Sequence, residues 1–342
     1  MPERDVLVVP SGLAEALDDA LSPSIFVDAE EQLATRAAWL YFVAGQTQAQ
    51  IGKKLGITRG RVNRLLADAR EQGLVQITVT GRLADCVALE DKVKTAYNLQ
   101  DVVVVPTPPD VNQLRLVIAT AAGEYLGSRL KDGMSVGMGW GRTLRLSLRS
   151  VPRKRFKNLS VVALIGGLTK SSAVNSHETA SHLADIIGAQ CFYFAAPAFT
   201  DTAATRDVLM GQTMLRDVFE RGRKVDLAFL SVGELTMANT MVMLGLIDRA
   251  EVQSLMRMGA VGDICSHWID RFGKIISHPL NDRAVALAPP YLKDIKSVVL
   301  VSGGRNKVLP IAGALRARYA NVLVTDEVTA KALLAEATNT DA

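Results

Sequence analysis

Cysteine is scarce in this chain of 342 residues. The three cysteines, Cys86, Cys191 and Cys265, stand far apart, and no Cys-x-x-Cys pair occurs. The sequence therefore indicates neither a disulfide framework nor a cysteine-based zinc site, and a reducing cytoplasm is the simplest setting. His177 and His182 are five residues apart, so they do not share a helix face as metal ligands four apart would. We expect neither a metal nor a cofactor.

A long apolar run is also lacking. No run approaches the ~20 apolar residues that span a bilayer, so we expect no membrane partner. The charged residues Glu3, Arg4 and Asp5 do not fit a signal peptide. Prolines and scattered acidic residues predict a loosely held arm over residues 1–28. Internal repeats and low-complexity tracts are missing as well.

Apolar residues and local charge are what the chain does contain. Hydrophobic residues make up 49% of it, which excludes global disorder, and its length suggests two domains. The formal net charge is only +4, yet residues 35–82 contain eight Lys and Arg against two acidic residues. A basic segment on a nearly neutral body is typical of a nucleic-acid-binding module attached to another domain.

Residues 47–66 carry the pattern of a helix-turn-helix. Thr47 can cap a first short helix, because its hydroxyl accepts a free backbone N–H. Gly56 stands where a tight turn needs an unhindered backbone, and Thr58 can cap the second helix. The second helix then carries one apolar stripe at i, i+3, i+4 and i+7, formed by Val62, Leu65, Leu66 and Ala69.

The opposite face of that second helix is basic and polar. Asn and Arg side chains match base edges in the major groove, and Gly60 removes bulk where the helix would approach the duplex. Lysines on the preceding helix suit backbone phosphates. An ordinary surface hairpin with solvated charges is the alternative. The residues expected to contact double-stranded operator DNA are Lys53, Lys54, Thr58, Arg59, Gly60, Arg61, Asn63 and Arg64.

Two more helices flank this motif. Residues 29–43, capped by Asp28, would complete a three-helix domain, and residues 74–79 suit a short strand or wing. The helical pattern of residues 83–97 fits a linker or dimerisation helix, or a helix that packs only on its own domain. The predicted division is therefore an arm (1–28), a helix-turn-helix domain (29–82), a linker helix (83–98) and a C-terminal domain (99–342).

From residue 101 onward, short valine-rich runs alternate with helical segments. This alternation predicts parallel strands joined by crossover helices, hence a doubly wound, mostly parallel α/β domain. The predicted strands are Val102–Val105, Met134–Gly137, Leu159–Leu164, Cys191–Phe194, Leu227–Val232, Val298–Val301 and Val322–Val324. The predicted helices include Val111–Leu130, His177–Ile187 and Leu309–Tyr319.

Glycine clusters follow three of these strands, at residues 137–143, 166–167 and 303–307. In open α/β sheets the ligand crevice lies outside the carboxyl ends of the strands, where free N–H groups favour an anion. The first loop adds Arg142 and Thr143, which could hold a phosphate. It matches neither the dinucleotide fingerprint nor a P-loop, and a plain tight turn is the alternative.

Two acidic residues, Asp263 and Glu234, are candidates for binding sugar hydroxyls. Each could equally be a helix cap or a surface carboxylate. Ser171 and Ser172 with His177 do not form a nucleophile elbow, and no catalytic triad signature is found.

Taken together, these segments resemble the SorC family of bacterial sugar-binding transcriptional regulators, from about Ala29 to about Leu334. The segment from Leu55 to Leu66 is similar to the family's DNA-binding helices. The C-terminal half is similar in five segments: Gly139–Thr143, Asn175–Ala180, Ala260–Cys265, Gly303–Lys307 and Val324–Glu327.

The resemblance implies a C-terminal effector domain akin to phosphosugar isomerases. It would bind a sugar, a polyol or a phosphorylated derivative, and the protein would form homodimers or homotetramers on operator DNA. One departure is Glu234, which follows Gly233 where the family often has a small residue. The expected effector-binding residues are Gly139, Trp140, Gly141, Arg142, Thr143, Glu234, Asp263, Gly303, Gly304, Asn306 and Lys307.

Two classes of function therefore remain at this stage. The first is a transcriptional regulator of carbohydrate or polyol metabolism. The second is a sugar-phosphate isomerase that carries a DNA-binding arm. An isomerase needs a placed general base with a tuned pKa, for which Asp263 and Glu234 are candidates. The basic helix favours the regulator.

Overall fold

The computed structural model describes residues 29–71, 74–75, 83–168 and 175–338. The chain divides into two compact units, residues 1–77 and 78–342. The predicted arm with its Asp28 cap and most of the predicted strand at 74–79 lie outside the described residues. In the described part, no helix has the length and apolar character that crossing a membrane requires.

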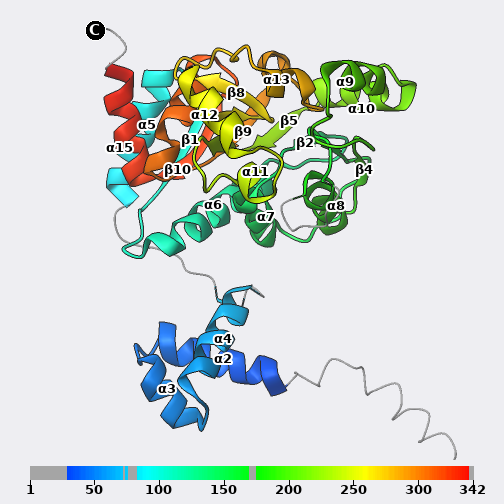
Figure 1. The fold of residues 1–342 in the computed structure, drawn as a ribbon. Helices are drawn as coiled ribbons and strands as arrows, with labels where there is room; N and C mark the ends of the chain where they lie inside the picture. Colours follow the sequence, from blue (N-terminus) through cyan, green and yellow to red (C-terminus); the bar gives the residue numbers. More distant parts are fainter. Residues whose placement is uncertain (1–28, 72–73, 76–82, 169–174, 339–342) are drawn as a thin grey trace, which may run out of the picture. The chain divides into compact units, whose positions relative to one another are not determined.

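The first unit is helical (Figure 1). It contains α2 (Ala29–Phe42), α3 (Gln48–Leu55) and α4 (Arg59–Glu71). The side chain of Thr47 accepts a hydrogen bond from the Gln50 N–H, and the Gln50 side chain accepts one from the Thr47 N–H, which together form a capping box. Gly56 ends α3 in the left-handed region, with φ of 69°. The buried core comprises Ala34, Ala37, Ala38, Leu40, Ile51, Val62, Leu65, Leu66 and Ala69.

The second unit is built on a seven-stranded parallel sheet in the order β1-β10-β9-β5-β2-β3-β4. Its strands are β1 (Asp101–Val105), β2 (Ser135–Met138), β3 (Ser160–Ala163), β4 (Gln190–Phe192), β5 (Leu227–Leu230), β9 (Ser297–Val301) and β10 (Val322–Asp326). The predicted strands agree with these closely. The doubly wound α/β prediction is confirmed.

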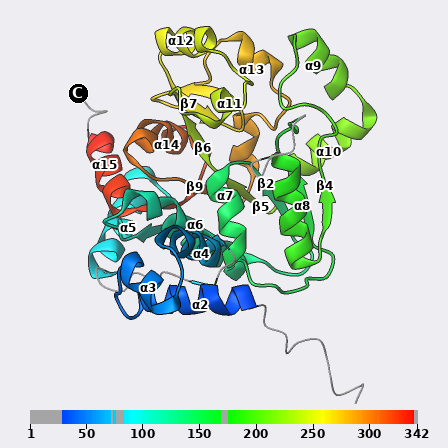
Figure 2. The same ribbon diagram turned by 60° about the horizontal axis from the view of Figure 1, so that its bottom comes forward.

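Helices cover both faces of this sheet because successive strand residues point to opposite sides. In β9, Val298 and Leu300 belong to one core, whereas Val299 and Val301 belong to the other. The helices of the first face are α5 (Leu83–Tyr97), α10 (Thr213–Arg223), α14 (Val308–Arg316) and α15 (Glu327–Thr338). Those of the second are α6 (Leu114–Arg129), α7 (Arg142–Ser147) and α8 (Ser176–Ile187), which lie in a row (Figures 1 and 2).

The predicted linker helix packs against this second unit. In α5, Leu89 and Val93 are buried in the first core, and the Tyr97 hydroxyl donates to the Leu333 carbonyl at 2.8 Å. Figure 1 shows α5 beside α15 at the β1 end of the sheet. This helix is therefore packed on the second unit, and its role as a linker or dimerisation helix stays a prediction.

A small antiparallel sheet was not predicted. It consists of β6 (Val232–Glu234), β7 (Ala260–Ile264) and β8 (His267–Asp270). The predicted strand 227–232 was wrong at its end, because the chain leaves the large sheet after Leu230 and begins β6 at Val232. The remaining α-helices are α9 (Ala203–Met210), α11 (Thr240–Met243), α12 (Arg249–Arg257) and α13 (Pro279–Arg283).

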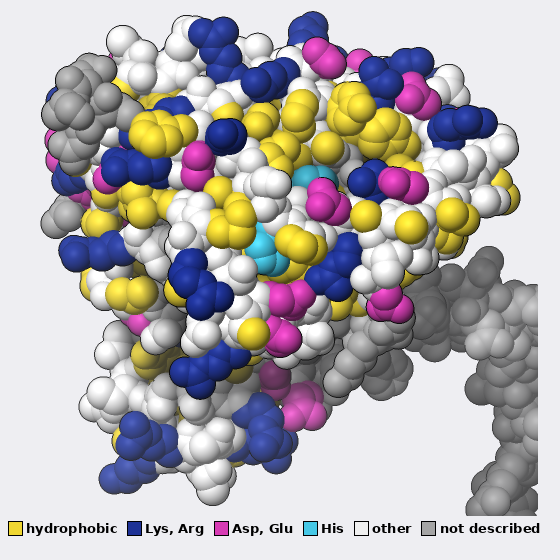
Figure 3. Space-filling view, turned by 45° about the horizontal axis from the view of Figure 1, so that its top comes forward, with side chains coloured by type: hydrophobic (Ala, Val, Ile, Leu, Met, Phe, Trp, Pro, Cys, Tyr) yellow, Lys and Arg dark blue, Asp and Glu magenta, His cyan; other side chains and the backbone are white. Residues whose placement is uncertain are grey.

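Short 3-10 turns complete the description: η1 (Val111–Gln113), η2 (Leu148–Ser150), η3 (Pro289–Asp294) and η4 (Arg305–Lys307). The predicted helix 111–130 therefore begins as 3-10 turn η1 before α6. On the face that Figure 3 turns forward, positive and negative side chains are interspersed among hydrophobic ones. That face thus carries no broad surface of one sign.

Candidate functional site

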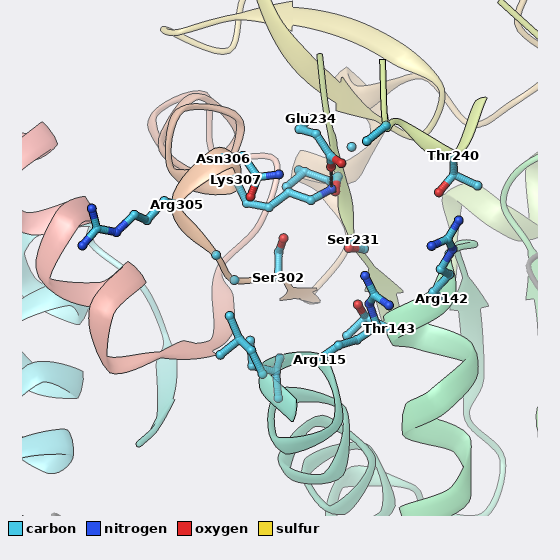
Figure 4. Close-up of a pocket in the computed structure, with 18 of the residues that line it drawn as sticks. Arg115, Arg142, Thr143, Ser231, Glu234, Thr240, Ser302, Arg305, Asn306 and Lys307 are labelled. Atoms are coloured by element: carbon cyan, nitrogen blue, oxygen red, sulfur yellow. Dashed lines mark hydrogen bonds and ion pairs between the residues drawn. The ribbon is translucent and has the colours of Figure 1, made fainter. Parts of the chain in front are cut away.

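A pocket of about 750 Å³ lies at the carboxyl ends of the parallel strands. The strand order reverses between β2 and β5, because the chain proceeds outward from β2 to β4 on one side and from β5 to β10 on the other. Such a switch point leaves a crevice between two loops that diverge in opposite directions. The residues that follow β1, β2, β5 and β9 all line the pocket (Figure 4).

The loop after β2 forms one wall. The Gly139 N–H donates to the Phe229 carbonyl at 2.9 Å and so attaches this loop to β5. Gly141 has φ of 124° and ψ of 160°, a conformation that essentially only glycine adopts. It redirects the chain into α7, so Arg142 and Thr143 line the pocket. The Arg142 guanidinium contacts the sulfur of Met243 at 3.3 Å.

The loop after β9 forms the opposite wall, and Asp326 holds it. The Gly304 N–H donates to the Thr329 hydroxyl at 2.8 Å and to the Asp326 carboxylate at 3.3 Å. The Thr107 hydroxyl donates to the same carboxylate at 2.8 Å. A Cβ at Gly303 would collide with that carboxylate, so the loop can approach it only as glycine. The turn η4 then presents Lys307 to the pocket.

The small sheet brings the two candidate acids together with Lys307. Gly233 pairs with Asp263 across β6 and β7, which places Glu234 one residue beyond that pair. The Lys307 ammonium forms an ion pair with the Glu234 carboxylate and donates to the Val232 carbonyl at 2.7 Å. Lys307, although it belongs to the second glycine loop, is therefore already paired with the Glu234 carboxylate of the small sheet.

Asp263 is almost completely buried, since only 3% of its surface is exposed to solvent. Its pKa is raised to about 7, chiefly because the carboxyl is buried; the Lys307 ammonium lowers this pKa, and the neighbouring Glu234 carboxylate raises it. Its Oδ1 has no hydrogen-bond partner among the described atoms. A buried carboxyl with an unused oxygen is costly to leave unpaired, and a ligand hydroxyl could satisfy it.

Asn239 holds the segment that passes over these acids. Its side-chain amide donates to the Glu234 carbonyl, and its side-chain oxygen accepts from the Met241 N–H at 2.7 Å. Both Asn239 and Thr240 line the pocket. The segment from β6 to α11 is thus fastened to the small sheet where it borders the cavity.

The pocket brings together ten of the eleven predicted effector-site residues. Gly139 is the exception, because it lies against β5, where its N–H bonds the Phe229 carbonyl. Sequence reasoning missed further lining residues, although Thr107, Ser302 and Asp326 come within two residues after predicted strands and that position was a usable signal. The polar and charged residues that were missed include Thr107, Arg115, Ser231, Asn239, Thr240, Ser302 and Asp326.

The predicted DNA-binding face is displayed on the first unit. Val62, Leu65 and Leu66 are buried, whereas Asn63 and Arg64 on the opposite side of α4 are exposed. The side chain of Gln48 donates to the Asn63 side-chain oxygen at 3.2 Å. The other predicted contact residues are also exposed: Lys53, Lys54, Thr58, Arg59, Gly60 and Arg61.

Comparison with known proteins extends over nearly the whole chain. The family model described as a putative sugar-binding domain matches residues 81–335. The model of sigma-70 region 4 matches residues 39–72, which include the helix-turn-helix segment.

Relatives of more than 30% identity are among the proteins that match. The erythritol catabolism regulatory protein EryD of Brucella abortus is 32% identical over 311 residues, which cover 90% of this chain and 98% of the relative. The deoxyribonucleoside regulator of Bacillus subtilis is 34% identical over 308 residues, which cover 89% of this chain and 98% of that protein.

Solved structures agree with these relatives. The full-length sorbitol operon regulator SorC from Klebsiella pneumoniae matches with a TM-score of 0.68 at 26% identity, over 89% of this chain and 98% of that one. The putative sugar-binding domain of a transcriptional repressor from Vibrio fischeri matches with the same TM-score, 0.68, at 27% identity, over 74% of this chain and 100% of that one.

Proposed function

The chain belongs to the SorC-type family of sugar-binding transcriptional regulators, and from this premise we propose where it binds its effector and its DNA. It is a DNA-binding regulator of carbohydrate or polyol metabolism and not an enzyme. Its effector is a sugar, a polyol or a phosphorylated derivative, and the pocket at the switch point of the large sheet is where that effector binds.

One observation carries the proposed effector site. A single cavity collects two glycine loops, arginines and an incompletely paired buried carboxyl at the ends of five parallel strands. Guanidinium groups with a threonine hydroxyl suit a phosphate, and carboxylates suit sugar hydroxyls. The relatives are named as regulators of erythritol catabolism, of deoxyribonucleosides and of a sorbitol operon, and the compounds in these names all carry hydroxyl groups.

For DNA, α4 is the proposed recognition helix. Asn63 and Arg64 would contact base edges in the major groove, while Lys53 and Lys54 of α3 would contact backbone phosphates. The two lysines of α3 and the Asn63 and Arg64 side chains of α4 are all exposed, outside the buried core of the first unit.

We also propose a homodimer or homotetramer with two-fold symmetry. One helix-turn-helix buries too little surface for specific affinity, and two-fold dimers bind paired half-sites about one helical turn, or a multiple of it, apart. The division into an arm (1–28), a DNA-binding domain (29–82), a linker helix (83–98) and an effector domain (99–342) remains part of this proposal.

The isomerase alternative has no support from the relatives, which are named as regulators. Asp263 and Glu234 therefore need no role as a general base. Their proposed role is to accept hydrogen bonds from ligand hydroxyls.

A binding experiment tests the proposed site. Sugars, polyols and their phosphates are screened by thermal shift, since a ligand of the native state raises stability by mass action. The Arg142→Gln variant should lose the shift produced by a phosphorylated hit, whereas Arg257→Gln, exposed on α12 and outside the pocket lining, should keep it. An unchanged affinity of the Arg142 variant would show that the effector binds elsewhere.

A further inference from the structure

A second cavity, of about 560 Å³, lies in the same unit, and no described residue lines both it and the effector pocket. Helices α9 and α10 form one wall, and α13, the extended segment 284–288 and η3 form the other. Figures 1 and 2 show α9, α10 and α13 on the same side of this unit. The volume is in the range of small-molecule sites. We call this cavity the second pocket.

His267 of β8 gives the second pocket a hydrogen-bond acceptor. Only 8% of this residue is exposed, and it lines the cavity. Its Nδ1–H donates to the Cys265 carbonyl at 2.7 Å. Burial lowers the pKa of His267 to about 4, although the Cys265 bond raises it, so the ring is neutral near pH 7 and Nε2 keeps a lone pair. In the described ranges Nε2 has no hydrogen-bond partner, which favours a ligand with an O–H or N–H donor.

The neighbouring amide of Asn281 does not compete for that donor. Its side-chain oxygen accepts from the Trp268 N–H at 2.7 Å, and its nitrogen donates to the carbonyls of Trp268 and Ile276 at 3.1 and 2.7 Å. Asn281 is therefore saturated by the backbone around it, and His267 is the polar group available at this part of the cavity.

The wall beside His267 is apolar and flat. Ala284, Ala286 and Ala288 alternate along an extended segment, so their methyl groups point to one side, into the second pocket. Phe219 and Tyr291, whose ring centroids are 5.2 Å apart, also line it. A wall of methyl groups and aromatic rings offers a sugar no hydrogen bonds but suits the apolar face of a planar ring.

The rim of the second pocket is rich in arginine. The charged residues that line the cavity are Arg206, Arg216, Glu220, Arg223 and Asp282. Arg223 pairs with Glu220, and Arg206 pairs with Asp207, each at 3.0 Å. Arg216 is exposed and forms no ion pair within the described part of the chain. Its guanidinium is therefore available to one carboxylate of a ligand.

His267 also holds the turn that connects the second pocket with the effector pocket. The two turn residues between β7 and β8, Cys265 and Ser266, have φ of 48° and 60°, which costs energy for residues other than glycine. The Asp263 carboxylate accepts from the Ser266 N–H, and the His267 ring donates to the Cys265 carbonyl. One of these fasteners lines the effector pocket and the other lines the second pocket. A ligand that orders His267 therefore stabilises the turn beside Asp263.

We propose that the second pocket binds a hydroxylated aromatic carboxylate and that this ligand stabilises the β7–β8 hairpin. The hydroxyl donates to His267 Nε2, the ring lies against the alanine wall, and the carboxylate pairs with Arg216. Such a ligand would be a second regulatory compound, chemically unlike a sugar or polyol. Its binding does not depend on the proposed effector site, because the two cavities have different linings.

Calorimetry on the full chain tests the ligand class. The compounds are 4-hydroxyphenylacetate and 3-(4-hydroxyphenyl)propionate, which differ in the distance between ring and carboxylate. Each is compared with its analogue without the hydroxyl and with its analogue that has an alcohol in place of the carboxylate. At least one hydroxy acid should bind, and at least fivefold more tightly than both of its analogues. No binding of either acid, or equal binding of an analogue, would overturn the proposal.

Variants then locate the binding. Arg216→Gln should weaken the hydroxy acid at least fivefold, whereas the control Arg257→Gln, exposed and outside both pocket linings, should leave it unchanged. His267→Asn keeps an amide donor for the Cys265 carbonyl but lacks Nε2, so it should remove the advantage that the hydroxyl confers. If His267→Asn does not fold, the exposed Arg216 still decides the question. Unchanged affinity of Arg216→Gln would place the ligand elsewhere and overturn the proposal.

Hydrogen exchange tests the effect on the hairpin. Amides in peptides that cover residues 260–270 should exchange more slowly when the hydroxy acid is bound, and Arg216→Gln should lose this protection at the same ligand concentration. Unchanged exchange in the saturated protein would refute the link to the turn. Arg142→Gln in the effector pocket should bind the hydroxy acid normally, so a failure of this proposal leaves the proposed effector site standing.

Discussion

At the scale of single residues, Asp263 is the side chain with the clearest physical signature. Its folded pKa of about 7 lies above the ordinary value of 3.8 because the carboxyl is buried. Between these two pH values the folded state keeps a proton that the unfolded state has released. The free energy of unfolding therefore falls as pH rises through this window, and the loss is complete above pH 7.

The prediction is that Asp263→Asn stabilises the protein increasingly as pH rises. Melting temperatures of the variant and the unchanged protein are compared at pH 4.5 and pH 8, without ligand. The difference between them should be larger at pH 8. Asp91→Asn, which changes an exposed residue of α5, serves as the control and should show no such trend. A constant difference for Asp263→Asn would mean that its carboxyl titrates normally.

Arg64 is the residue that best tests base recognition. If it contacts a base, Arg64→Ala should cost about 1–3 kcal/mol on a specific site, while Lys53→Ala should weaken all sequences alike and flatten the salt dependence. Fluorescence anisotropy with the protein's own upstream DNA and with a scrambled duplex distinguishes the two effects. Equal affinity of the Arg64 variant and the unchanged protein for the upstream DNA would exclude a reading role.

The Glu234–Lys307 pair shows where sequence reasoning stops. Both residues were predicted to lie in the site, and the glycine loops pointed to the correct edge of the sheet. That the two meet, however, depends on the small antiparallel sheet, which places Glu234 against η4. No local pattern encodes a contact between positions so far apart in the chain, so the sequence predicted Lys307 as an effector-binding residue without predicting its ion pair with Glu234.

At the scale of helices and strands, replacing either of two helical glycines by alanine should change the free energy of unfolding, in opposite directions for the two positions. Gly60 of α4 has nothing within 4 Å of an added Cβ. Gly60→Ala should therefore stabilise the first unit by about 0.5–1 kcal/mol through helix propensity. It should nevertheless weaken DNA binding, because the methyl group would stand where α4 approaches the duplex.

Gly123 of α6 is the counterpart. An added Cβ there would overlap the Ser147 carbonyl and lie 2.9 Å from the Ser150 Cβ, where α6 packs against α7 and η2. Gly123→Ala should destabilise the second unit despite the better helix propensity of alanine. Chemical unfolding of both variants provides the measurement, and a gain in stability for Gly123→Ala would contradict the packing described here.

The sequence predicted those helices and strands whose apolar residues form a strong pattern. The strands of the large sheet are continuous runs because helices bury both faces, as Val298–Val301 illustrates. The small sheet lacks such runs, since β7 contains Gly262 and the buried Asp263. Its strands are also short, so neither alternation nor a hydrophobic run was available to predict them.

At the scale of the whole molecule, regulation requires that the effector bind one arrangement of the protein better than another. A coupling free energy of about 1–3 kcal/mol, or roughly 5–150-fold in affinity, is the usual range for such control. The helix α5 follows the first unit in sequence and packs on the edge of the large sheet through Leu89 and Val93. It is therefore the element through which we expect this coupling to pass.

The proposed two-fold oligomer makes a prediction of its own. Sedimentation at working concentration should give a dimer or a tetramer, and footprinting of the upstream DNA should protect two half-sites about one helical turn, or a multiple of it, apart. A monomer that protects one half-site would contradict the proposed assembly.

The central claim is that one unit binds DNA while the pocket of the other controls that binding. The most direct test measures affinity for the upstream DNA by fluorescence anisotropy, with and without the best phosphorylated hit from the thermal-shift screen. The affinity of the unchanged protein for this DNA should change at least fivefold when the hit is present. Arg142→Gln should bind DNA normally but lose the shift, whereas Arg64→Ala should lose DNA affinity but still bind the effector. The account would be contradicted if the hit still shifted the DNA affinity of the Arg142 variant, or if the Arg64 variant bound this DNA as tightly as the unchanged protein.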